Sequence, residues 1–192
     1  METKLDLAFL IDGSIVVTKE NFLSFISFTK AFTATLNVSE ENTHVSVAVY
    51  GDSPYLFAND SYNQSSLEQH FDSILYPGSL QSNLGEALLH VASTLYNKRD
   101  TRSNVTRVLV ILTASKCHDD ITVPSYLILN HYRVKVFVIA VGGHYSIGQV
   151  NEISSDPDSD YVHTVESGQN LSAEVVLFKD KLAQGEIVAL YH

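Results

Sequence analysis

The chain has 192 residues, of which 45% are hydrophobic and 18% charged, proportions typical of a globular protein rather than a disordered one. Twenty-two acidic against twelve basic residues give a formal net charge of -10, which argues against a nucleic-acid-binding protein with its basic stripe. No apolar run approaches the ~20 residues of a membrane-spanning helix, so no membrane span is predicted.

The first predicted unit is a buried strand, a polar turn and a helix. Residues 7–11 are all apolar and run into Asp12, Gly13 and Ser14, a pattern typical of a parallel strand covered on both faces. Residues 18–36 then carry apolar side chains at helical spacing. In such a unit the turn lies at the C-terminal edge of the sheet, where ligands bind. We therefore expect a carboxylate and a hydroxyl at that edge.

The rest of the chain alternates between predicted strands and helices. Alternating valines indicate a strand over residues 43–50, and Pro54, which cannot donate to a sheet ladder, marks the next strand as an edge. The other elements are expected at residues 55–57 (short strand), 65–72 (helix), 83–96 (helix), 105–113 (central strand), 121–131 (helix), 134–141 (strand), 146–153 (helix), 161–164 (strand) and 172–183 (helix).

This order predicts an α/β fold, a doubly wound, mostly parallel sheet of Rossmann-like type with one short antiparallel edge strand and helices on both faces. The sequence contains no internal repeat, low-complexity tract or linker. We therefore predict a single domain over residues 1–192, with a core of about 5–183 and a C-terminal tail, 184–192, that has no assigned element.

Loops at the predicted sheet edge carry the clearest motifs. They are the turn at residues 12–16, the segment 78–85 before a helix, and the segment 113–116 after the central strand. At this point the sequence resembles the von Willebrand factor type A (VWA) domain family, also called the integrin I-domain fold. The resemblance covers nearly the whole chain and is nearest in type to extracellular-matrix members such as collagen VI and the matrilins. Its marks are FLIDGS (9–14), KENF (19–22), NLGEAL (83–88), VLVILT (108–113), VFVIAVG (136–142) and EISSDP (152–157).

Domains of this family often carry a metal-ion-dependent adhesion site, built from D-x-S-x-S, a Thr in the second loop and an Asp in the third. Mg²⁺ prefers about six hard oxygen ligands, which such a set supplies together with water. Matched by position, Asp12 and Ser14 are retained and Ser82 replaces the Thr, but Val16 replaces the second Ser and Ala114 replaces the Asp.

The two losses predict that this chain has no metal cofactor of the usual kind. One carboxylate ~4 Å from a divalent ion contributes roughly 4 kcal/mol per unit charge at an effective dielectric of ~20, and about 1.4 kcal/mol is a factor of ten in affinity. The alternative is Mg²⁺ or Ca²⁺ held by Asp12, Ser14, Ser82 and a recruited acid, for which Asp119 and Asp120 are the candidates.

The resemblance implies a non-enzymatic adhesion module that binds collagen, another matrix protein or another VWA domain, here without metal. Candidate residues of the binding face are Ser79, Gln81, Ser115, Lys116, His118 and Tyr145. A hydrolase is an alternative that rests on Ser14 and scattered acids. It is remote because the chain lacks the G-x-S-x-G motif that places a nucleophilic serine in many hydrolases. The acids at 119 and 120 precede a helix, where capping and the helix dipole favour them without any catalytic role.

Two signals disagree about the compartment. Cys117 is the only cysteine, which excludes an internal disulfide and favours a reducing compartment; its role is open between a reactive or intermolecular thiol and a plain loop residue. Five N-x-S/T sequons instead favour a glycosylated, secreted protein. Their asparagines, all in predicted loops or element ends, are Asn37, Asn59, Asn63, Asn104 and Asn170. Together with the resemblance, they predict an extracellular matrix protein.

Overall fold

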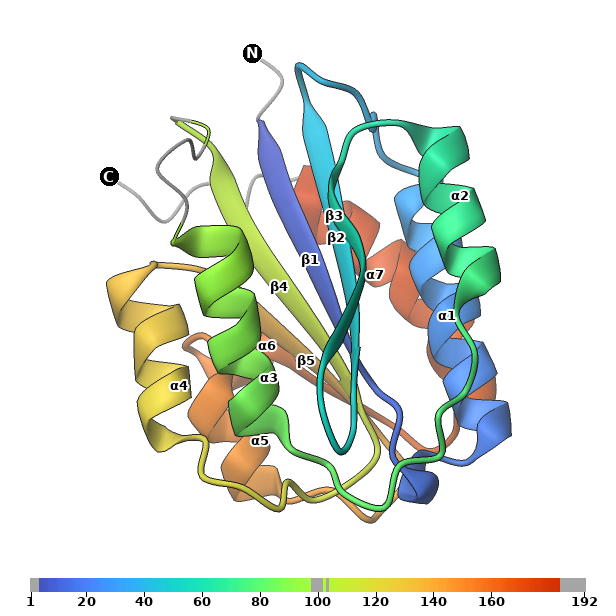
Figure 1. The fold of residues 1–192 in the computed structure, drawn as a ribbon, viewed down its shortest axis with the longest axis vertical. Coiled ribbons are helices and arrows are strands. Elements are labelled where there is room, and N and C mark those ends of the chain that lie inside the picture. The colour runs from blue at the N-terminus through green and yellow to red at the C-terminus, as the bar shows by residue number, and fades with distance from the viewer. Residues whose placement is uncertain (1–3, 98–101, 103, 184–192) are drawn as a thin grey trace.

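The computed structural model, which describes residues 4–97, 102 and 104–183, is built around a six-stranded sheet in the order β3-β2-β1-β4-β5-β6 (Figure 1). Neighbouring strands are parallel except for the β2–β3 pair, which is antiparallel. The predicted fold class is thus confirmed. The strands are β1 (Leu5–Asp12), β2 (Thr43–Tyr50), β3 (Tyr55–Ser61), β4 (Thr106–Thr113), β5 (Lys135–Val141) and β6 (Val162–Val165).

Helices cover both faces of the sheet (Figure 1). One layer contains α1, α2 and α7, and the other contains α3, α4 and α5. The helices are α1 (Lys19–Thr33), α2 (Gln64–Ser73), α3 (Leu84–Val91), α4 (Thr122–Tyr126), α5 (Ile147–Ile153), α6 (Asp158–Tyr161) and α7 (Leu171–Ala183), with short 3-10 turns η1 (Ile15–Val17) and η4 (Gly168–Asn170). Helices α3 and α4 continue as π-helical segments, η2 (Ala92–Tyr96) and η3 (Leu127–His131).

The alternation of side chains along each strand creates a hydrophobic core on either side of the sheet. In β1, Leu7, Phe9 and Ile11 pack toward α1. Ala8 and Leu10 pack toward α3. Because both faces are covered, the strand is apolar without interruption, which is the pattern that the sequence shows.

The structure differs from the expected elements in two places. Strand β3 extends to Ser61 instead of ending at residue 57, because it pairs with β2 through register shifts at Val45, Val47 and Ala48. Tyr161 ends α6 and does not start the last strand. The predicted tail, 184–192, lies outside the described residues. No helix in the described part of the chain combines the length and the apolar character needed to cross a bilayer.

Candidate functional site

The predicted loops do meet at the C-terminal edge of the sheet. The Ile15 amide donates to the Ser79 carbonyl (2.7 Å), and the Ser79 amide donates to the Gly13 carbonyl (3.0 Å). An added Cβ at Gly13 would lie 2.5 Å from Pro77 Cγ, so this close approach of two loops requires glycine. The third loop joins them, because the His118 amide donates to the Ser82 carbonyl (2.9 Å). We call this junction the rim.

Asp12 lies at the centre of the rim, fully buried, with both carboxylate oxygens engaged by its own chain. Oδ1 accepts the Ser14 amide (2.9 Å). Oδ2 accepts the hydroxyls of Thr113 (2.9 Å) and Ser115. The Ser14 hydroxyl in turn donates to Ser115 Oγ (3.2 Å). These donors compensate the buried negative charge in the way that a bound cation would otherwise do.

Tyr50 is a rim residue that the sequence reasoning missed. It is the register partner of Asp12 on the neighbouring strand and is 1% exposed. Burial, and then the charge of Asp12, raise the pKa of its hydroxyl well above the ordinary value. Within the described residues, neither this hydroxyl nor the buried Ser82 Oγ has a hydrogen-bond partner of good geometry. Alternation along β2 shows which face Tyr50 occupies, but only the register shows that it adjoins Asp12.

The residues present at the rim do not fit a Mg²⁺ ion. Val16, 38% exposed in η1, and Ala114, buried in the core on the α1 side, supply no side-chain oxygen. The two acids that could replace the lost carboxylate are engaged elsewhere. Asp119 accepts the amides of Gly85 (3.0 Å) and Glu86 (2.7 Å) at the N-terminus of α3. Asp12, whose oxygens already accept hydrogen bonds, cannot by itself provide the set of oxygen ligands that an octahedral Mg²⁺ site needs.

Asp119 and Asp120 both cap helices, but Asp119 caps a different helix from the predicted one. Asp120 Oδ1 accepts the Thr122 amide (3.0 Å) at the start of α4, as expected for a residue preceding that helix. This backbone hydrogen bond lowers the pKa of the exposed Asp120 carboxyl. Asp119 does not cap the helix that follows it but binds the distant α3, where the helix dipole favours an anion.

The candidate binding-face residues differ in their exposure. Gln81, Lys116 and His118 are exposed, and Ser79 and Tyr145 are half-buried. The prediction that Ser115 belongs to the binding face is wrong, because this residue is only 6% exposed and its hydroxyl is directed into the rim toward Asp12. Apolar side chains that sequence reasoning did not select are exposed there instead, namely Ile15 (56%) and Leu80 (73%). The pairing of Ser14 with Ser79 brings their two loops together.

The sequon asparagines are all exposed, but not all lie in loops. Asn59 lies within β3, which corrects its predicted loop position. Asn63 is the N-cap of α2, where its Oδ1 accepts the Ser66 amide (2.9 Å). Asn170 lies in η4, and Asn104 has a positive φ of 56° just before β4. Glycosylation at these positions stays a prediction.

Cys117 is a buried loop residue. Its thiol donates to the Asp119 carboxylate (2.8 Å), and its backbone amide donates to Gln149 Oε1 (3.0 Å). Burial, followed by the hydrogen bond to Asp119, raises the pKa of the thiol to about 11. An unreactive thiol is the expected consequence, because the thiolate is the nucleophilic form.

Comparisons with known proteins agree on one family. Residues 6–176 match the family model described as von Willebrand factor type A domain. The collagen alpha-1(XXI) chain of Xenopus laevis is 28% identical over 184 residues, which cover 95% of this chain and 19% of that protein. The von Willebrand factor A domain-containing protein 2 of Xenopus laevis is 29% identical over 163 residues, covering 82% and 20%. This chain therefore spans about a fifth of the length of these relatives.

A solved structure shares the fold. Proximal thread matrix protein 1 from the mussel byssus, in a form described as having a zinc-occupied MIDAS motif, superposes with a TM-score of 0.85 at 17% sequence identity. The match covers 95% of this chain and 48% of that one. At this identity the likeness concerns the fold alone.

Proposed function

The chain belongs to the von Willebrand factor type A domain family, and from this premise we propose that it is a non-enzymatic interaction module of a secreted extracellular-matrix protein that binds its partner without a metal ion. The relatives include a collagen and a VWA-domain protein, which supports a matrix setting. Collagen, another matrix protein or a second VWA domain is the proposed partner.

The state of Asp12 is the observation that carries metal independence. Its two oxygens accept an amide and two hydroxyls from this chain. A metal ion would have to displace those donors and would gain no second carboxylate, since Asp119 is held at α3. The absence of ligand oxygens at Val16 and Ala114 also supports metal independence.

Exposed apolar side chains supply an alternative basis for binding. Ile15 and Leu80 project from adjacent rim loops, where Lys116 and Gln81 are also exposed. An apolar centre with a polar surround is the usual composition of a protein–protein contact. We propose that this surface replaces the metal-bridged contact of the family.

The test measures binding to immobilised triple-helical collagen and to an immobilised second copy of this chain, in Mg²⁺ and in EDTA. We expect one of these probes to bind with the same affinity in both buffers. We also expect Leu80→Asp to weaken that binding at least about tenfold, because a charge in an apolar contact is desolvated without compensation. The matched control is Leu89→Asp, at a 45% exposed position on the solvent side of α3. Loss of binding in EDTA contradicts the proposal.

A metal-dependent mode is the second candidate, with Mg²⁺ or Ca²⁺ held by Asp12, Ser14 and Ser82. It is favoured by one observation, the buried Ser82 Oγ and Tyr50 hydroxyl that lack partners of good geometry. Calorimetric titration with Mg²⁺, with Asp12→Ala as the comparison, separates the two modes. A hydrolase finds no such support, because the Ser14 hydroxyl donates to Ser115 and not to a histidine.

A further inference from the structure

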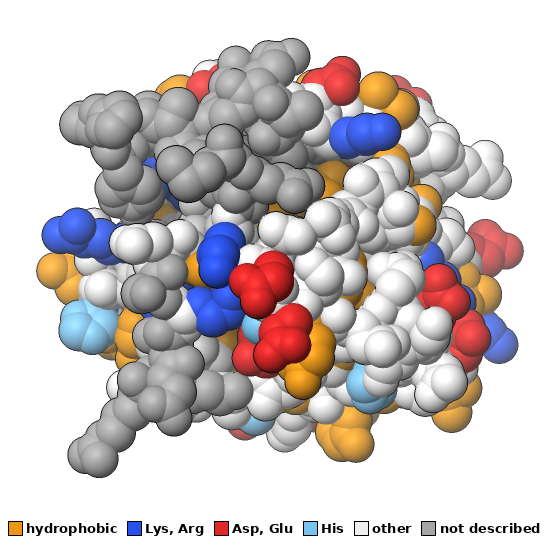
Figure 2. All heavy atoms as spheres, turned by 90° about the horizontal axis from the view of Figure 1, so that it is seen from above, with side chains coloured by type: hydrophobic (Ala, Val, Ile, Leu, Met, Phe, Trp, Pro, Cys, Tyr) orange, Lys and Arg blue, Asp and Glu red, His pale blue; other side chains and the backbone are white. Residues whose placement is uncertain are grey.

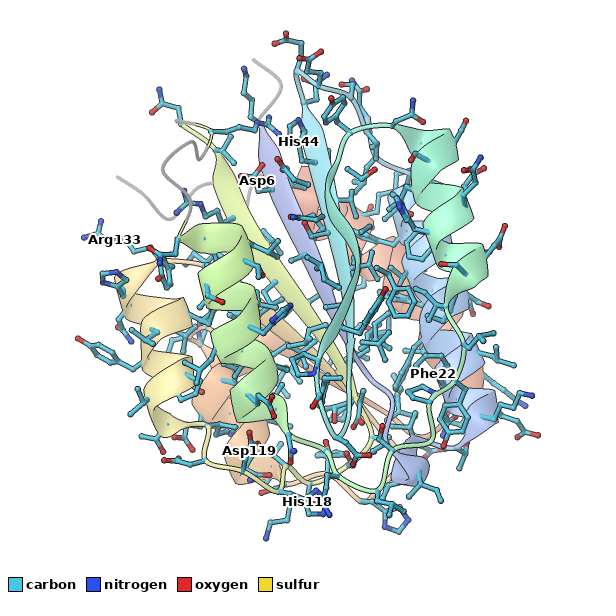
Figure 3. The ribbon with its side chains drawn as sticks, in the orientation of Figure 1. Asp6, Phe22, His44, His118, Asp119 and Arg133 are labelled. Carbon is cyan, nitrogen blue, oxygen red and sulfur yellow. The ribbon has the colours of Figure 1, made fainter. Side chains whose placement is uncertain are left out.

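A second cluster of ligand-type side chains lies at the opposite end of the sheet from the rim. Asp6, His44 and Asp60 each offer one ligand atom, and these atoms lie within 4.8 Å of one another. Figure 3 places Asp6 and His44 at one end of the sheet and His118 and Asp119 at the other. Seen from that end, acidic and basic side chains lie together in the middle of the face (Figure 2).

The strand register and an irregularity in β3 bring the cluster together. Asp6 and His44 are direct register partners on β1 and β2. Asp60 lies where β3 shifts its register against β2, and its φ of 55° is in the left-handed region. Its amide donates to Ser46 Oγ (2.9 Å), which holds this irregular backbone against β2. Bulges of this kind often redirect a side chain next to a functional site.

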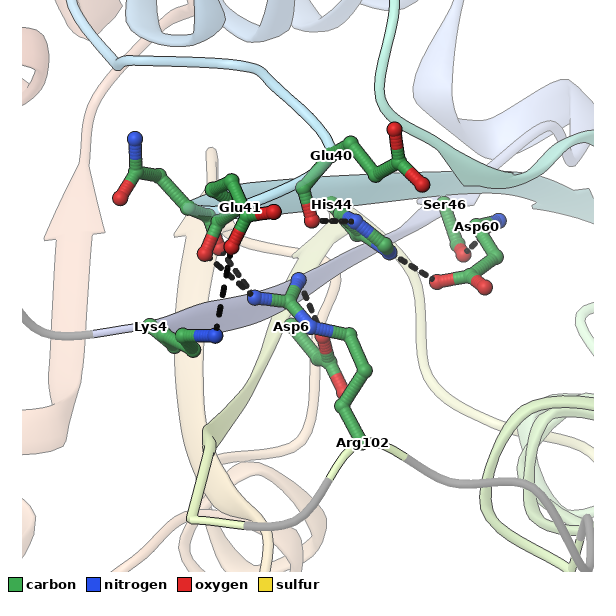
Figure 4. Close-up of polar contacts among 9 residues, drawn as sticks. Lys4, Asp6, Glu40, Glu41, His44, Ser46, Asp60 and Arg102 are labelled. Atoms are coloured by element: carbon green, nitrogen blue, oxygen red, sulfur yellow. Dashed lines mark hydrogen bonds and ion pairs between the residues drawn. The ribbon is translucent and has the colours of Figure 1, made fainter.

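Two side chains of the cluster, Asp6 and His44, are oriented by outer partners (Figure 4). His44 Nε2 lies 3.0 Å from the Glu40 carbonyl and Nδ1 lies 2.9 Å from Asp60 Oδ1, so both ring nitrogens face acceptors, and an ion bound between Nδ1 and Asp60 would take the place of any proton there. Arg102 Nη1 donates to Asp6 Oδ1 (3.2 Å) while its Nη2 donates to the Asn42 carbonyl (2.6 Å). Such outer hydrogen bonds are the usual support of histidine and carboxylate metal ligands.

A small cavity and an unpartnered hydroxyl give independent support for a ligand here. The cavity, of about 50 Å³, is lined by the cluster together with Tyr96 and Arg102. Its volume exceeds the roughly 10–15 Å³ that one water needs. Tyr96 is 6% exposed, and its hydroxyl has no hydrogen-bond partner within the described residues. Tyr96 and Asp6 line the same cavity.

We propose that Asp6, His44 and Asp60 bind one divalent transition-metal ion, of which Zn²⁺ is the representative. An imidazole with two carboxylates suits zinc, whereas Mg²⁺ and Ca²⁺ prefer sites made of oxygen alone. A water on the ion would complete four-coordination and accept or donate a hydrogen bond at Tyr96.

The geometry requires one movement. Zinc bonds of about 2.0 Å in a tetrahedron place two ligand atoms about 3.3 Å apart. The His44 and Asp60 atoms are already at 2.9 Å, while the widest separation in the cluster is within 4.8 Å. The Asp60 side chain is 55% exposed and has room to adjust its position, whereas His44 is only 8% exposed. The ion would then join the edge strand β3 to β1 and β2.

The test is calorimetric titration of the intact chain with Zn²⁺, supported by the visible spectrum of a Co²⁺ complex. We expect one ion per chain, and we expect His44→Gln and Asp60→Asn each to weaken binding at least about tenfold. The matched control for histidine is His144→Gln, at an exposed position after β5. Asp60→Asn changes an exposed side chain, so it remains informative if the buried His44 variant fails to fold.

A rim variant distinguishes this site from the one implied by the family. Ser14→Ala should leave zinc binding unchanged, because Ser14 lies at the other end of the sheet. The proposal is overturned if the wild-type chain binds no zinc, if binding is unaffected in both His44→Gln and Asp60→Asn, or if binding is lost in Ser14→Ala. That last outcome would also contradict the metal-independent rim, whereas the first two would leave the proposed adhesion function untouched.

Discussion

Replacing Ser115 with Ala tests whether the rim carboxylate is stabilised by its own chain. Ser115 is buried and donates its hydroxyl to Asp12 Oδ2, while its oxygen accepts the Ser14 hydroxyl. The substitution removes one donor from a fully buried charge and one acceptor from a buried hydroxyl. In a rim that held a metal through the usual residues, Ser115 would not be a ligand.

The expected loss follows from these two hydrogen bonds. A hydrogen bond to a charged group contributes about 1.5–3 kcal/mol and one between neutral groups about 0.5–1.5 kcal/mol. Thr113 and the Ser14 amide remain on Asp12 and limit the loss. We therefore expect Ser115→Ala to lower the free energy of unfolding by about 2–4 kcal/mol.

Urea unfolding, with and without Mg²⁺, measures this loss. The control is Ser53→Ala, at an exposed position between β2 and β3, which should change the stability by less than about 0.5 kcal/mol. A double-mutant cycle with Asp12→Asn should give a coupling energy of at least about 1 kcal/mol. A loss below about 0.5 kcal/mol, a coupling near zero, or stability of the wild-type chain that depends on Mg²⁺ would refute the reasoning.

Three further predictions concern buried groups. Cys117, with a pKa of about 11, should react with iodoacetamide slowly at pH 8, where about a thousandth of it is thiolate, and quickly in urea. Burial raises the pKa of Tyr50 and Tyr96, so the unfolded chain loses these protons first. The contribution of each tyrosine to the free energy of unfolding should be constant below about pH 10 and should fall by up to about 1.4 kcal/mol per pH unit above it. Tyr96→Phe should reduce that slope when urea unfolding is measured as a function of pH. Gly85→Ala should lower the free energy of unfolding by about 1–3 kcal/mol in the same assay, because the added Cβ would lie 2.2 Å from the Asp120 carbonyl oxygen. Unchanged stability would contradict the close packing of α3 on the loop that contains Asp120.

Most of the fold could be predicted because its signals lie within single segments. The apolar run that becomes β1 and the helical spacing of α1 each reflect burial of that segment alone. Strand β3 was predicted too short, since its extension to Ser61 depends on an irregular pairing with β2 that no pattern inside residues 55–61 reveals. The parallel order expected of the strands also predicted that the rim loops meet at one edge of the sheet.

The site was predictable only in part. Asp12, Ser14 and Ser82 do lie at one rim, as their positions after strands or before a helix indicated. Ser115 was expected to face a partner but is directed toward Asp12, and Asp119 binds α3 instead of its own helix. In both cases the choice among several possible hydrogen-bond partners was settled by the packing of distant loops.

By itself, the sequence determined the order of strands and helices, the two-sided burial of the sheet and the loss of ligand oxygens at Val16 and Ala114. These properties depend on residue type and on local periodicity. Only the tertiary structure decided that Asp12 is satisfied by residues about a hundred positions away, and that Asp6, His44 and Asp60 share one cavity. Such contacts depend on strand register and loop packing, which arise when the whole chain minimises its buried, unsatisfied polar groups.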